Sequence, residues 1–593
     1  MQLQLDDPLY YLNNFHKVLN WLQQRHADLL LADELALLRR FGELAQPAQA
    51  LLVRMIMRKG QHFRASKLEY AEIGCTRTAA EALLATGLIS DAQALSPQEV
   101  FSLLRKDELL EHFDAHALRR LKKDELLEHL SALHPEPRRF ADWCPNLDEQ
   151  VYSLGIHALC ERLRLMFFGN LRQDWSEFVL ADLGIFRYEQ VELSADSRVF
   201  RHRGDVDCYL HLQACRDAFE AGEPLPEVLQ RINAQSCDTP FLAARRSKLL
   251  FRLGQQLERE AQLESALACY ADCDYADARL RRIRVLERLA RPTEAYALAR
   301  EAAAAPHNDA ESQGVQRALQ RLGRQLGLDK PAPAKVPTPS RLDLSLPRPE
   351  AQNRPLKSVG EAGNTRQKQA RKRSLRAVNE HSEPVFNAVL PTQVVFQRPV
   401  SVEYAVKLHL SKPDAPVHYV ENSLICSLFG LLCWPAIFAP LPGAFFHPFH
   451  SGPVDLLSAD FHPRRAELFA ACLAQLDSDA YKSTIRQTYA AKYGILSPFV
   501  FWGALDAELL EQALDCLPAA HLRAWFQRLL LDIKANRAGM PDLIQFWPAH
   551  KRYRMIEVKG PGDRLQDNQR RWLAFCAEHG MPVDVCYVQW ADA

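Results

Sequence analysis

The sequence has no excess of charge of either sign, because its 73 Lys and Arg balance its 73 Asp and Glu. Without an overall positive field, any nucleic-acid surface must be a local basic patch. The 14 cysteines include no Cys-x-x-Cys pair, and no secretory signal is found at the start. We therefore expect reduced thiols in a cytoplasmic protein rather than a disulfide framework.

Long hydrophobic runs are also missing. Residues 424–446 are apolar, but three prolines and a glycine interrupt them, which predicts a buried helix and loop rather than a membrane span. The chain has no Walker-type phosphate loop, which argues against an ATP-driven motor, and no Gly-x-Ser-x-Gly elbow of a serine hydrolase. With 593 residues, 48% of them hydrophobic, it is long enough for three or four globular domains.

The most informative segment runs from residue 539 to residue 559. Leu543–Trp547 and Tyr553–Val558 are rich in β-formers, and a proline-containing turn separates them, so a hairpin is predicted. A helix at Gln566–His579 and a strand at Val583–Trp590 are predicted to follow, after a helix at Ala519–Asn536. This order of helix, hairpin, helix and strand is what a nuclease core of the Pro-Asp…(Asp/Glu)-x-Lys type requires.

The hairpin carries the residues for that chemistry. Asp542 opens the first strand, while Glu557 and Lys559 lie two apart on the second, on one face and about 7 Å from each other. The Val558 side chain points to the other face, which leaves its carbonyl available as an oxygen ligand. Such a site suits Mg²⁺ or Mn²⁺, and the lysine can steady a phosphate or orient a water. An ordinary hairpin with surface charges is the alternative.

These residues resemble the VRR-nuc domain at the carboxyl end of the Fanconi-associated nucleases. The block 421–438 is similar to the helix of that family that carries its third acidic ligand, which maps onto Glu421, and the block 54–73 is similar to its DNA-binding segment. Asn422 stands where the family often has Gly, and Pro435 where it often has Asp. The remaining matches are Asp542, Glu557, Val558, Lys559, Asp563, Arg564, Leu565, Gln569 and Trp572.

The resemblance implies a structure-specific nuclease for branched DNA, which cuts near 5′ flaps, trims in the 5′ to 3′ direction (phosphodiesterase I type) and acts in interstrand cross-link repair. Glu421, Asp542, Glu557 and the Val558 carbonyl would hold one or two Mg²⁺ or Mn²⁺ ions, with Lys559 beside the reacting phosphate. Support would come from Gln569, Asp455 and Arg464. We expect a bacterial-type, nucleoid-associated monomer without the ubiquitin-binding zinc finger of eukaryotic relatives.

Three segments are candidates for contacts with DNA phosphates. Residues 54–67 hold six basic and no acidic side chains, and Lys106–His112 recurs as Lys123–His129, which predicts a SAP-type helical hairpin. Leu257–Arg259 recurs as Leu286–Arg288, which predicts a short tetratricopeptide-like array. Solvated helix surfaces are the alternative. The candidates are Arg54, Arg58, Lys59, Arg64 and Lys67, then Arg119, Arg120, Lys122 and Lys123, then Arg279, Arg281, Arg282 and Arg284.

The predicted fold is a mostly helical amino-terminal two-thirds followed by an α/β restriction-endonuclease-like nuclease domain. The predicted divisions are a winged-helix-like DNA-binding domain at 1–95, a SAP-like hairpin at 96–138, a tetratricopeptide-like domain at 139–328, a Pro-rich basic linker at 329–385 and the nuclease domain at 386–593, with its core at about 480–593. The basic run 366–376 within the linker is either a solvated extended segment or a strap for the DNA backbone.

Other functions remain open on the residues alone. The same core could belong to a junction resolvase or a restriction-like enzyme, which usually act as symmetric dimers. A non-catalytic helical scaffold for repair proteins is a further possibility. We reject a zinc site at His447, His450 and Asp455, because the loop offers no clear fourth ligand.

Overall fold

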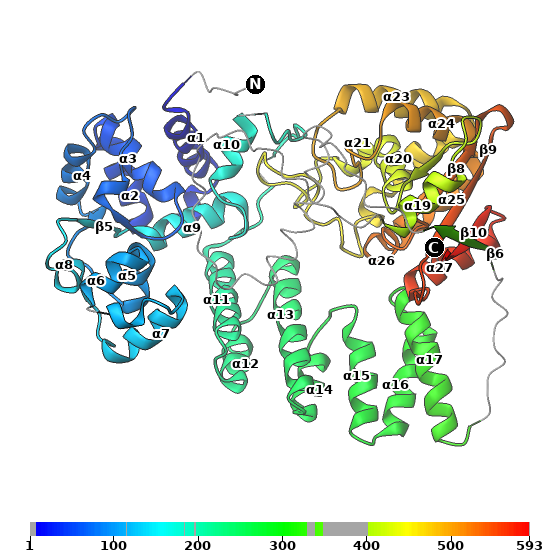
Figure 1. Cartoon of the computed structure of the whole chain (residues 1–593), viewed down its shortest axis with the longest axis horizontal. Coiled ribbons are helices and arrows are strands. Elements are labelled where there is room, and N and C mark those ends of the chain that lie inside the picture. The colour runs from blue at the N-terminus through cyan, green and yellow to red at the C-terminus, as the bar shows by residue number, and fades with distance from the viewer. Residues whose placement is uncertain are drawn as a thin grey trace.

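The computed structural model describes residues 7–113, 115–182, 184–194, 197–328, 339–347 and 401–591. The amino-terminal helices lie at the left of Figure 1 and the carboxy-terminal domain, for which a nuclease core is predicted, at the right, with a row of helices, α11 to α17, below them. No helix in the described ranges is long and apolar enough to cross a membrane. The basic run 366–376 lies outside the described residues.

The amino-terminal region packs helices around a small antiparallel sheet in the order β1-β5-β2. Its apolar side chains, from Tyr11 to Tyr209, form one buried cluster, so the helix α9 and its neighbours belong to this core. The elements are α1 (Tyr10–Arg25), α2 (Ala32–Glu43), α3 (Gln46–Met57), β1 (His62–Arg64), α4 (Thr76–Ala85), β2 (Ile89–Ser90), β5 (Val151–Leu154), α9 (His157–Phe168) and α10 (Ser176–Asp182).

The predicted repeat forms the helical hairpin between β2 and β5. Both copies start a helix, because Glu108 and Glu125 each accept a hydrogen bond from the backbone amide three residues earlier, at 2.7 Å. Leu109 and Leu126 are fully buried, whereas the second leucine of each pair is only half-buried. The elements are β3 (Ala94–Leu95), α5 (Pro97–Leu103), α6 (Lys106–His112), α7 (Lys123–Leu133), β4 (Arg138–Arg139) and α8 (Phe140–Trp143).

The second repeat forms a row of antiparallel helix pairs. Ala266 and Ala295 are completely buried, as expected for small residues that let paired helices approach closely. Ion pairs recur between alternate helices, since Arg288 binds Glu258 and Arg321 binds Glu287. The helices are α11 (Arg203–Glu220), α12 (Leu225–Asn233), α13 (Pro240–Arg259), α14 (Leu263–Ala271), α15 (Ala278–Arg288), α16 (Pro292–Ala304) and α17 (Asp309–Gln325).

The nuclease domain is built on a five-stranded sheet in the order β6-β10-β9-β8-β7. β10 pairs in parallel with β6 and β9, and β8 is antiparallel to both β7 and β9. One face of the sheet packs on α19 and the other on the large helical core that contains Trp572. The strands are β6 (Ser340–Pro347), β7 (Val417–Tyr419), β8 (Leu543–Trp547), β9 (Arg552–Lys559) and β10 (Val583–Ala591).

The hairpin and its flanking elements confirm the predicted order of the core. The helices around the sheet are α19 (Val402–Leu410), α20 (Leu424–Leu432), α21 (Trp434–Ile437), α22 (Ala466–Ala474), α23 (Ala480–Lys492), α24 (Ala507–Cys516), α25 (Ala519–Leu531), α26 (Ile533–Asn536) and α27 (Asp567–Glu578).

Two local predictions were wrong. The helix expected at Ala519–Asn536 breaks at Asp532, which adopts an extended backbone (φ −158°, ψ 95°) and caps α26 through its carboxylate. The linker expected at 329–385 includes β6, whose alternating leucines place one edge strand on the nuclease sheet.

The amino-terminal and nuclease domains meet at the loop that contains His447. Phe446 packs so closely on Gly169, at the end of α9, that a Cβ atom there would lie 2.3 Å from its ring, and Gly169 also has a positive φ of 63°. The His447 ring stacks on Phe167 with centroids 6.0 Å apart. This aromatic contact joins the amino-terminal region to the domain that contains His447.

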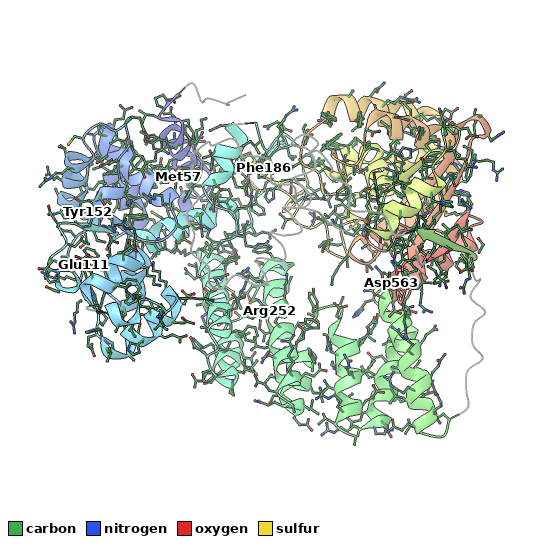
Figure 2. The ribbon with its side chains drawn as sticks, in the orientation of Figure 1. Met57, Glu111, Tyr152, Phe186, Arg252 and Asp563 are labelled. Carbon is green, nitrogen blue, oxygen red and sulfur yellow. The ribbon has the colours of Figure 1, made fainter. Side chains whose placement is uncertain are left out.

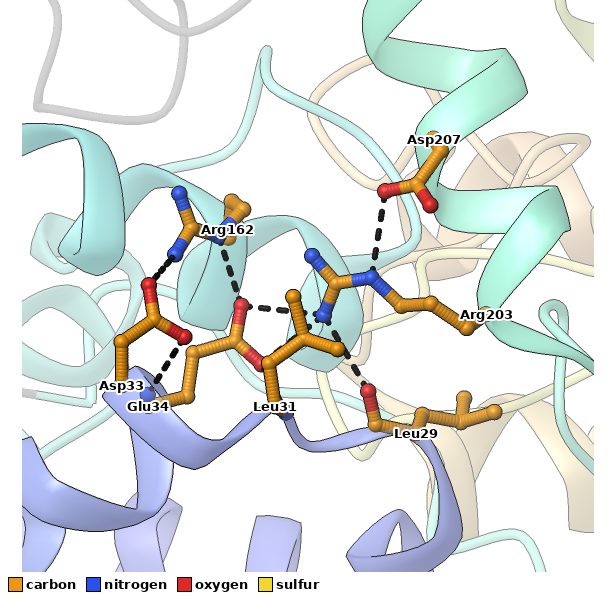
Figure 3. A network of polar contacts seen from close by, with 7 residues as sticks. All are labelled: Leu29, Leu31, Asp33, Glu34, Arg162, Arg203 and Asp207. Atoms are coloured by element: carbon orange, nitrogen blue, oxygen red, sulfur yellow. Dashed lines mark hydrogen bonds and ion pairs between the residues drawn. The ribbon is translucent and has the colours of Figure 1, made fainter.

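A buried carboxylate joins the amino-terminal core to the helix row (Figure 3). Glu34 on α2 is fully buried and accepts hydrogen bonds from Arg162 Nε at 2.6 Å and Arg203 Nη1 at 2.8 Å. These arginines come from α9 and α11, and Glu34 also accepts from the Leu31 amide at 2.9 Å. Glu34 therefore links three separate helices, while Asp33 and Asp207, which are more exposed, give Arg162 and Arg203 a second carboxylate each.

Replacing Glu34 with Ala should destabilise the amino-terminal region by about 1–3 kcal/mol, because two guanidinium groups would lose their buried partner and keep only the more exposed carboxylates of Asp33 and Asp207. Urea unfolding of the full chain, with hydrogen exchange of α2, α9 and α11, measures the loss. Glu43→Ala, at an exposed position of the same helix, is the matched control. Equal stability of the two variants would contradict the assigned role of Glu34.

Candidate active site

Asp542 lies at the mouth of β8, where the strand leaves the segment that follows α26. Its side chain is buried, and Oδ2 accepts a hydrogen bond from the backbone amide of Val558 at 2.8 Å. The Val558 side chain packs on the opposite face of the sheet, in the cluster with Leu543 and Ile556, as the alternation of side chains predicts. Asp542 is thus fixed to the neighbouring strand by the backbone itself.

Glu557 and Lys559 project from β9 to the same face, as predicted. Lys559 Nζ lies 2.7 Å from Glu557 Oε1, and Gln569 Nε2 donates to the same oxygen at 2.6 Å. Gln569 is itself oriented by the start of α27, because its Oε1 accepts from the Gln566 amide at 2.9 Å. The predicted return of Gln569 toward the site is therefore present. Glu557 is completely buried, and its Oε2 has no hydrogen-bond partner in the described residues.

Glu421 lies in the turn between β7 and α20, at the edge of the same site. Its Oε2 accepts a hydrogen bond from the Tyr419 hydroxyl, and its Oε1 accepts one from Asn422 Nδ2 at 3.1 Å. The Val420 amide donates to the Asp542 carbonyl at 2.9 Å, which joins this turn to β8. The three acids, remote in the sequence, are brought to one region of the sheet.

The two buried carboxylates, Asp542 and Glu557, both have raised pKa values. Burial raises the pKa of Asp542, and the charge of nearby Glu421 raises it further, while the Val558 amide opposes the change. Burial also raises the pKa of Glu557, and neighbouring Asp542 adds to the increase, while Lys559 opposes it. Raised pKa values of two neighbouring carboxyl groups are typical of functional sites.

The donor set fits a hard divalent cation. The two buried carboxylates offer oxygen ligands, and the partnerless Glu557 Oε2 is an acceptor without a donor in the described structure. The side chains are nevertheless held by their own hydrogen bonds, and no set of three or more His, Cys, Asp or Glu in the described ranges is gathered tightly enough to hold a metal ion. The ammonium group of Lys559 lies beside Glu557 and supplies a positive charge there.

Of the three residues predicted to support the site, Gln569 contacts Glu557, whereas Asp455 and Arg464 pair with each other. Asp455 accepts from Arg464 Nη1 at 2.6 Å and from Arg465 Nη1 at 2.8 Å, and Arg465 is almost fully buried. Within the described residues, neither Asp455 nor Arg464 contacts the acidic side chains by a hydrogen bond or ion pair. The pair braces the loop before α22.

His447 and His450, for which a zinc site was rejected above, belong to the loop that packs on α9 of the amino-terminal region. The rings of His447 and His450 stack with centroids 3.7 Å apart. Burial lowers the pKa of His450 to about 3 and that of His447 well below its usual value. Both rings are therefore neutral at physiological pH and pack as aromatic groups.

The predicted DNA-contacting residues of the amino-terminal region divide into two groups. Arg58, Lys59 and Lys67 are exposed. Arg54 is bound to Glu72, and Arg64 donates to Glu108 and Glu149 at 2.9 and 2.8 Å, so their charges are already balanced in the free protein. Arg64 thereby joins the sheet to the hairpin, and Arg54 holds α3 to the segment before α4.

The predicted DNA-contacting residues of the helical hairpin and the helix row also divide into exposed side chains and side chains held by contacts within the protein. Lys122 is exposed, whereas Lys123 Nζ donates to the Leu104 carbonyl at 2.8 Å and its pKa is lowered by burial. Arg281 binds Glu258 at 3.2 Å, and the Nε atom of half-buried Arg282 has no partner in the described residues. Arg281 thus contributes to contacts between repeats.

A group of cations that no sequence pattern indicated surrounds Lys248 on α13. Arg172 follows α9, Arg216 lies on α11, Lys248 and Arg252 lie on α13, and Lys534 lies on α26; Figure 2 labels Arg252. Surrounding atoms lower the pKa of Lys248 by desolvation, and the other four cations lower it further. No periodicity could have revealed this group, because it comes from four separate segments.

The matches to family models cover three parts of the chain. The model for the VRR-NUC domain matches residues 477–590, that for the "FAN1, HTH domain" matches residues 9–90, and that for the "Fanconi anemia-associated nuclease SAP domain" matches residues 94–143.

Whole-chain comparisons agree with these matches. The Fanconi-associated nuclease 1 homolog of Pseudomonas aeruginosa is 54% identical, over 99% of this chain and 97% of that protein. Human Fanconi-associated nuclease 1 is 27% identical, over 98% of this chain and 62% of that protein. The crystal structure of paFAN1 bound to DNA with a gap and a 2-nucleotide 5′ flap superposes with a TM-score of 0.88, at 54% identity and 100% coverage of both chains.

The sheet order and the acids on β8 and β9 define a nuclease of the restriction-endonuclease-like class. Two further observations narrow the family. The helical amino-terminal region matches family models of its own, and the similarity to relatives extends over the whole chain. The chain belongs to the Fanconi-associated nuclease 1 family.

The raised pKa of Glu557 predicts the pH dependence of stability. The folded chain holds this proton to a higher pH than the unfolded chain does, so the buried group costs stability as pH rises above the ordinary pKa of glutamate. Glu557→Gln should therefore raise the melting temperature of the metal-free protein at pH 8, by roughly 2–4 °C for about 1 kcal/mol.

Calorimetry at pH 8 and pH 5 tests this dependence, and the gain should shrink at pH 5, where the native carboxyl is protonated. Glu508→Gln, at an exposed position on α24, is the control and should change neither value. A variant that is less stable than the native chain at pH 8 would contradict the assigned cost of burial.

Proposed function

We propose that this chain is a divalent-metal-dependent DNA nuclease that cuts near 5′ flaps of branched DNA, trims in the 5′ to 3′ direction and acts in interstrand cross-link repair. The observation that carries the proposal is the buried pair Asp542 and Glu557, with Lys559 on the same face, in a chain superposable on a relative solved with 5′-flap DNA. Mg²⁺ and Mn²⁺ are the cations that suit this oxygen-rich donor set.

Each site residue has a role that follows from its position. Asp542, Glu557 and Glu421, with the Val558 carbonyl, would hold one or two metal ions. A bound Mg²⁺ or Mn²⁺ supplies Lewis-acid activation of a water and offsets charge on the phosphate. Lys559, released from its contact with Glu557, can orient the attacking water or stabilise the phosphate oxygens in the transition state. Gln569 keeps Glu557 in one orientation.

Lys248 and Arg172 provide a surface for the DNA backbone, whereas their neighbours Arg216, Arg252 and Lys534 are paired with Glu220 and Asp277. Lys248 and Arg172 have no ion pair or side-chain hydrogen bond in the described residues, so their charges are uncompensated. Lys534 lies on the short helix α26, and the segment after this helix carries Asp542 at the entrance of β8. DNA phosphates held here would be directed toward the acidic site, in addition to those held by Arg58, Lys59, Lys67 and Lys122.

The two other candidate functions have less support. A non-catalytic scaffold would have no need to bury two adjacent carboxylates, which costs stability without a cation. A junction resolvase of the symmetric type would need a dimer, whereas we propose that the chain acts as a monomer, with its helical region and its nuclease domain on one substrate. Sedimentation of the chain alone distinguishes these assemblies.

Asp542→Ala and Lys559→Ala should each lower cleavage of a 5′-flap duplex in Mg²⁺ by at least about 10²-fold, because a positioned catalytic group typically contributes that much. Metal-free binding to the same duplex should not change. Lys551→Gly, in the turn of the same hairpin and fully outside the site, is the matched control and should cut normally.

The same assay separates the alternatives. Normal cutting by Asp542→Ala in Mg²⁺ would refute the site assignment. Binding without any cutting by the native chain, in Mg²⁺ and in Mn²⁺, would favour the scaffold. A panel of flaps, forks, nicks and four-way junctions then ranks the substrates.

The double replacement Arg172→Gln, Lys248→Gln should weaken binding to flap DNA and reduce the slope of log affinity against log salt by about 2, since each phosphate contact contributes about 0.9. Arg231→Gln is the control, because its charge is already paired with Glu223. Fluorescence anisotropy between 50 and 300 mM salt (roughly the range where such slopes are linear) gives both values, and an unchanged slope would remove these residues from the DNA path.

A further inference from the structure

The turn that carries Glu421 is held to the strand entrance of Asp542 by one side chain. Asn422 Oδ1 accepts hydrogen bonds from the backbone amides of Gly539 at 2.8 Å and Met540 at 3.1 Å. Its Nδ2 donates to Glu421 Oε1 at 3.1 Å. The amide group therefore links the third acid to the segment that leads directly into Asp542.

The backbone of Asn422 is also unusual. Its φ of 55° lies in the left-handed region, which asparagine tolerates better than most residues and which glycine adopts freely. Glycine would keep this backbone but would leave both amides without their acceptor. The choice of asparagine is thus explained by the side-chain contacts and not by the turn alone.

Both sides of this link are rigid. On one side, α20 begins two residues after Asn422, and all nine of its residues are buried. On the other side, Gly539 is so close to Asn568 on α27 that a Cβ atom would lie 2.7 Å from its Nδ2. The Asn422 side chain therefore connects two fixed parts of the domain across the edge of the acidic site.

We propose that Asn422 is a positioning residue that pre-orders Glu421 for divalent-metal binding. The inference rests on the proposed metal-dependent function and adds a residue to it. Without the link, the Glu421 turn would have to be ordered when the cation binds, and this cost would appear as weaker metal affinity. Losing an outer partner of a metal ligand typically weakens metal binding by about 10–100-fold.

The test is Asn422→Gly, which keeps the backbone conformation and removes only the side-chain link. Titration calorimetry of the metal-free chain with Mn²⁺ should give a dissociation constant about 10-fold higher than that of the native chain. The Mn²⁺ concentration for half-maximal cleavage should rise by a similar factor, while the rate at saturating Mn²⁺ and the metal-free affinity for flap DNA stay close to native.

Lys551→Gly is the matched control, because Lys551 has a similar left-handed backbone (φ 48°) at the far end of the β8–β9 hairpin. A glycine at this position increases backbone freedom at a turn outside the acidic site. The Mn²⁺ affinity of Lys551→Gly should therefore equal that of the native chain. A merely structural role of Asn422 would lower the melting temperature and the maximal rate without shifting the Mn²⁺ dissociation constant, and that result would overturn the proposal.

Asp542→Ala, titrated in parallel, separates this inference from the proposed function. Native Mn²⁺ affinity in Asp542→Ala would refute the metal site itself. Loss of Mn²⁺ binding in Asp542→Ala, together with native affinity in Asn422→Gly, would refute the role of Asn422 alone. A shift of equal size in Asn422→Gly and Lys551→Gly would also refute it.

Discussion

The structure of the site depends on the burial of two carboxylates on one face of a twisted sheet. Asp542 and Glu557 come from adjacent strands, so their charges are close and poorly solvated, and only nearby positive charge can balance them. The Lys559 ammonium supplies part of that balance. The rest of the domain serves this constraint, because Gln569, the Val558 amide and the helices on that face hold the two acids in place.

The helical region extends the site into a surface for a large substrate. The aromatic contact between α9 and the His447 loop ties the amino-terminal core to the nuclease domain, and the last helix of the row, α17, contacts α27 through Arg317 and Asp567 at 2.7 Å. A chain with no net charge can then present cations locally, as at Lys248, while many other arginines are neutralised in ion pairs between helices.

Sequence patterns were reliable where a local rule acts on neighbouring residues. Alternation along β9 placed Glu557 and Lys559 on one face, and the turn residues after Trp547 set the hairpin. The charged repeat marked two helix starts because Glu108 and Glu125 cap their own helices. The break at Asp532 escaped the helical pattern, since its cause is a side-chain cap that competes with the helix, and β6 escaped because its neighbours in the sequence are rich in proline and charge.

The sequence by itself therefore determined the class of the core and the helical nature of the remainder, and it predicted that Glu557 and Lys559 share one face of a strand. Only the tertiary structure decided which basic residues keep a free charge, because pairing depends on partners far away in the chain: Arg64 binds Glu149, whereas Lys248 has no ion pair among the described residues and four cations near it. It also decided how Glu421 reaches the site, through the left-handed turn at Asn422. Charge balance and close packing are properties of the assembled fold, and no spacing in the sequence encodes them.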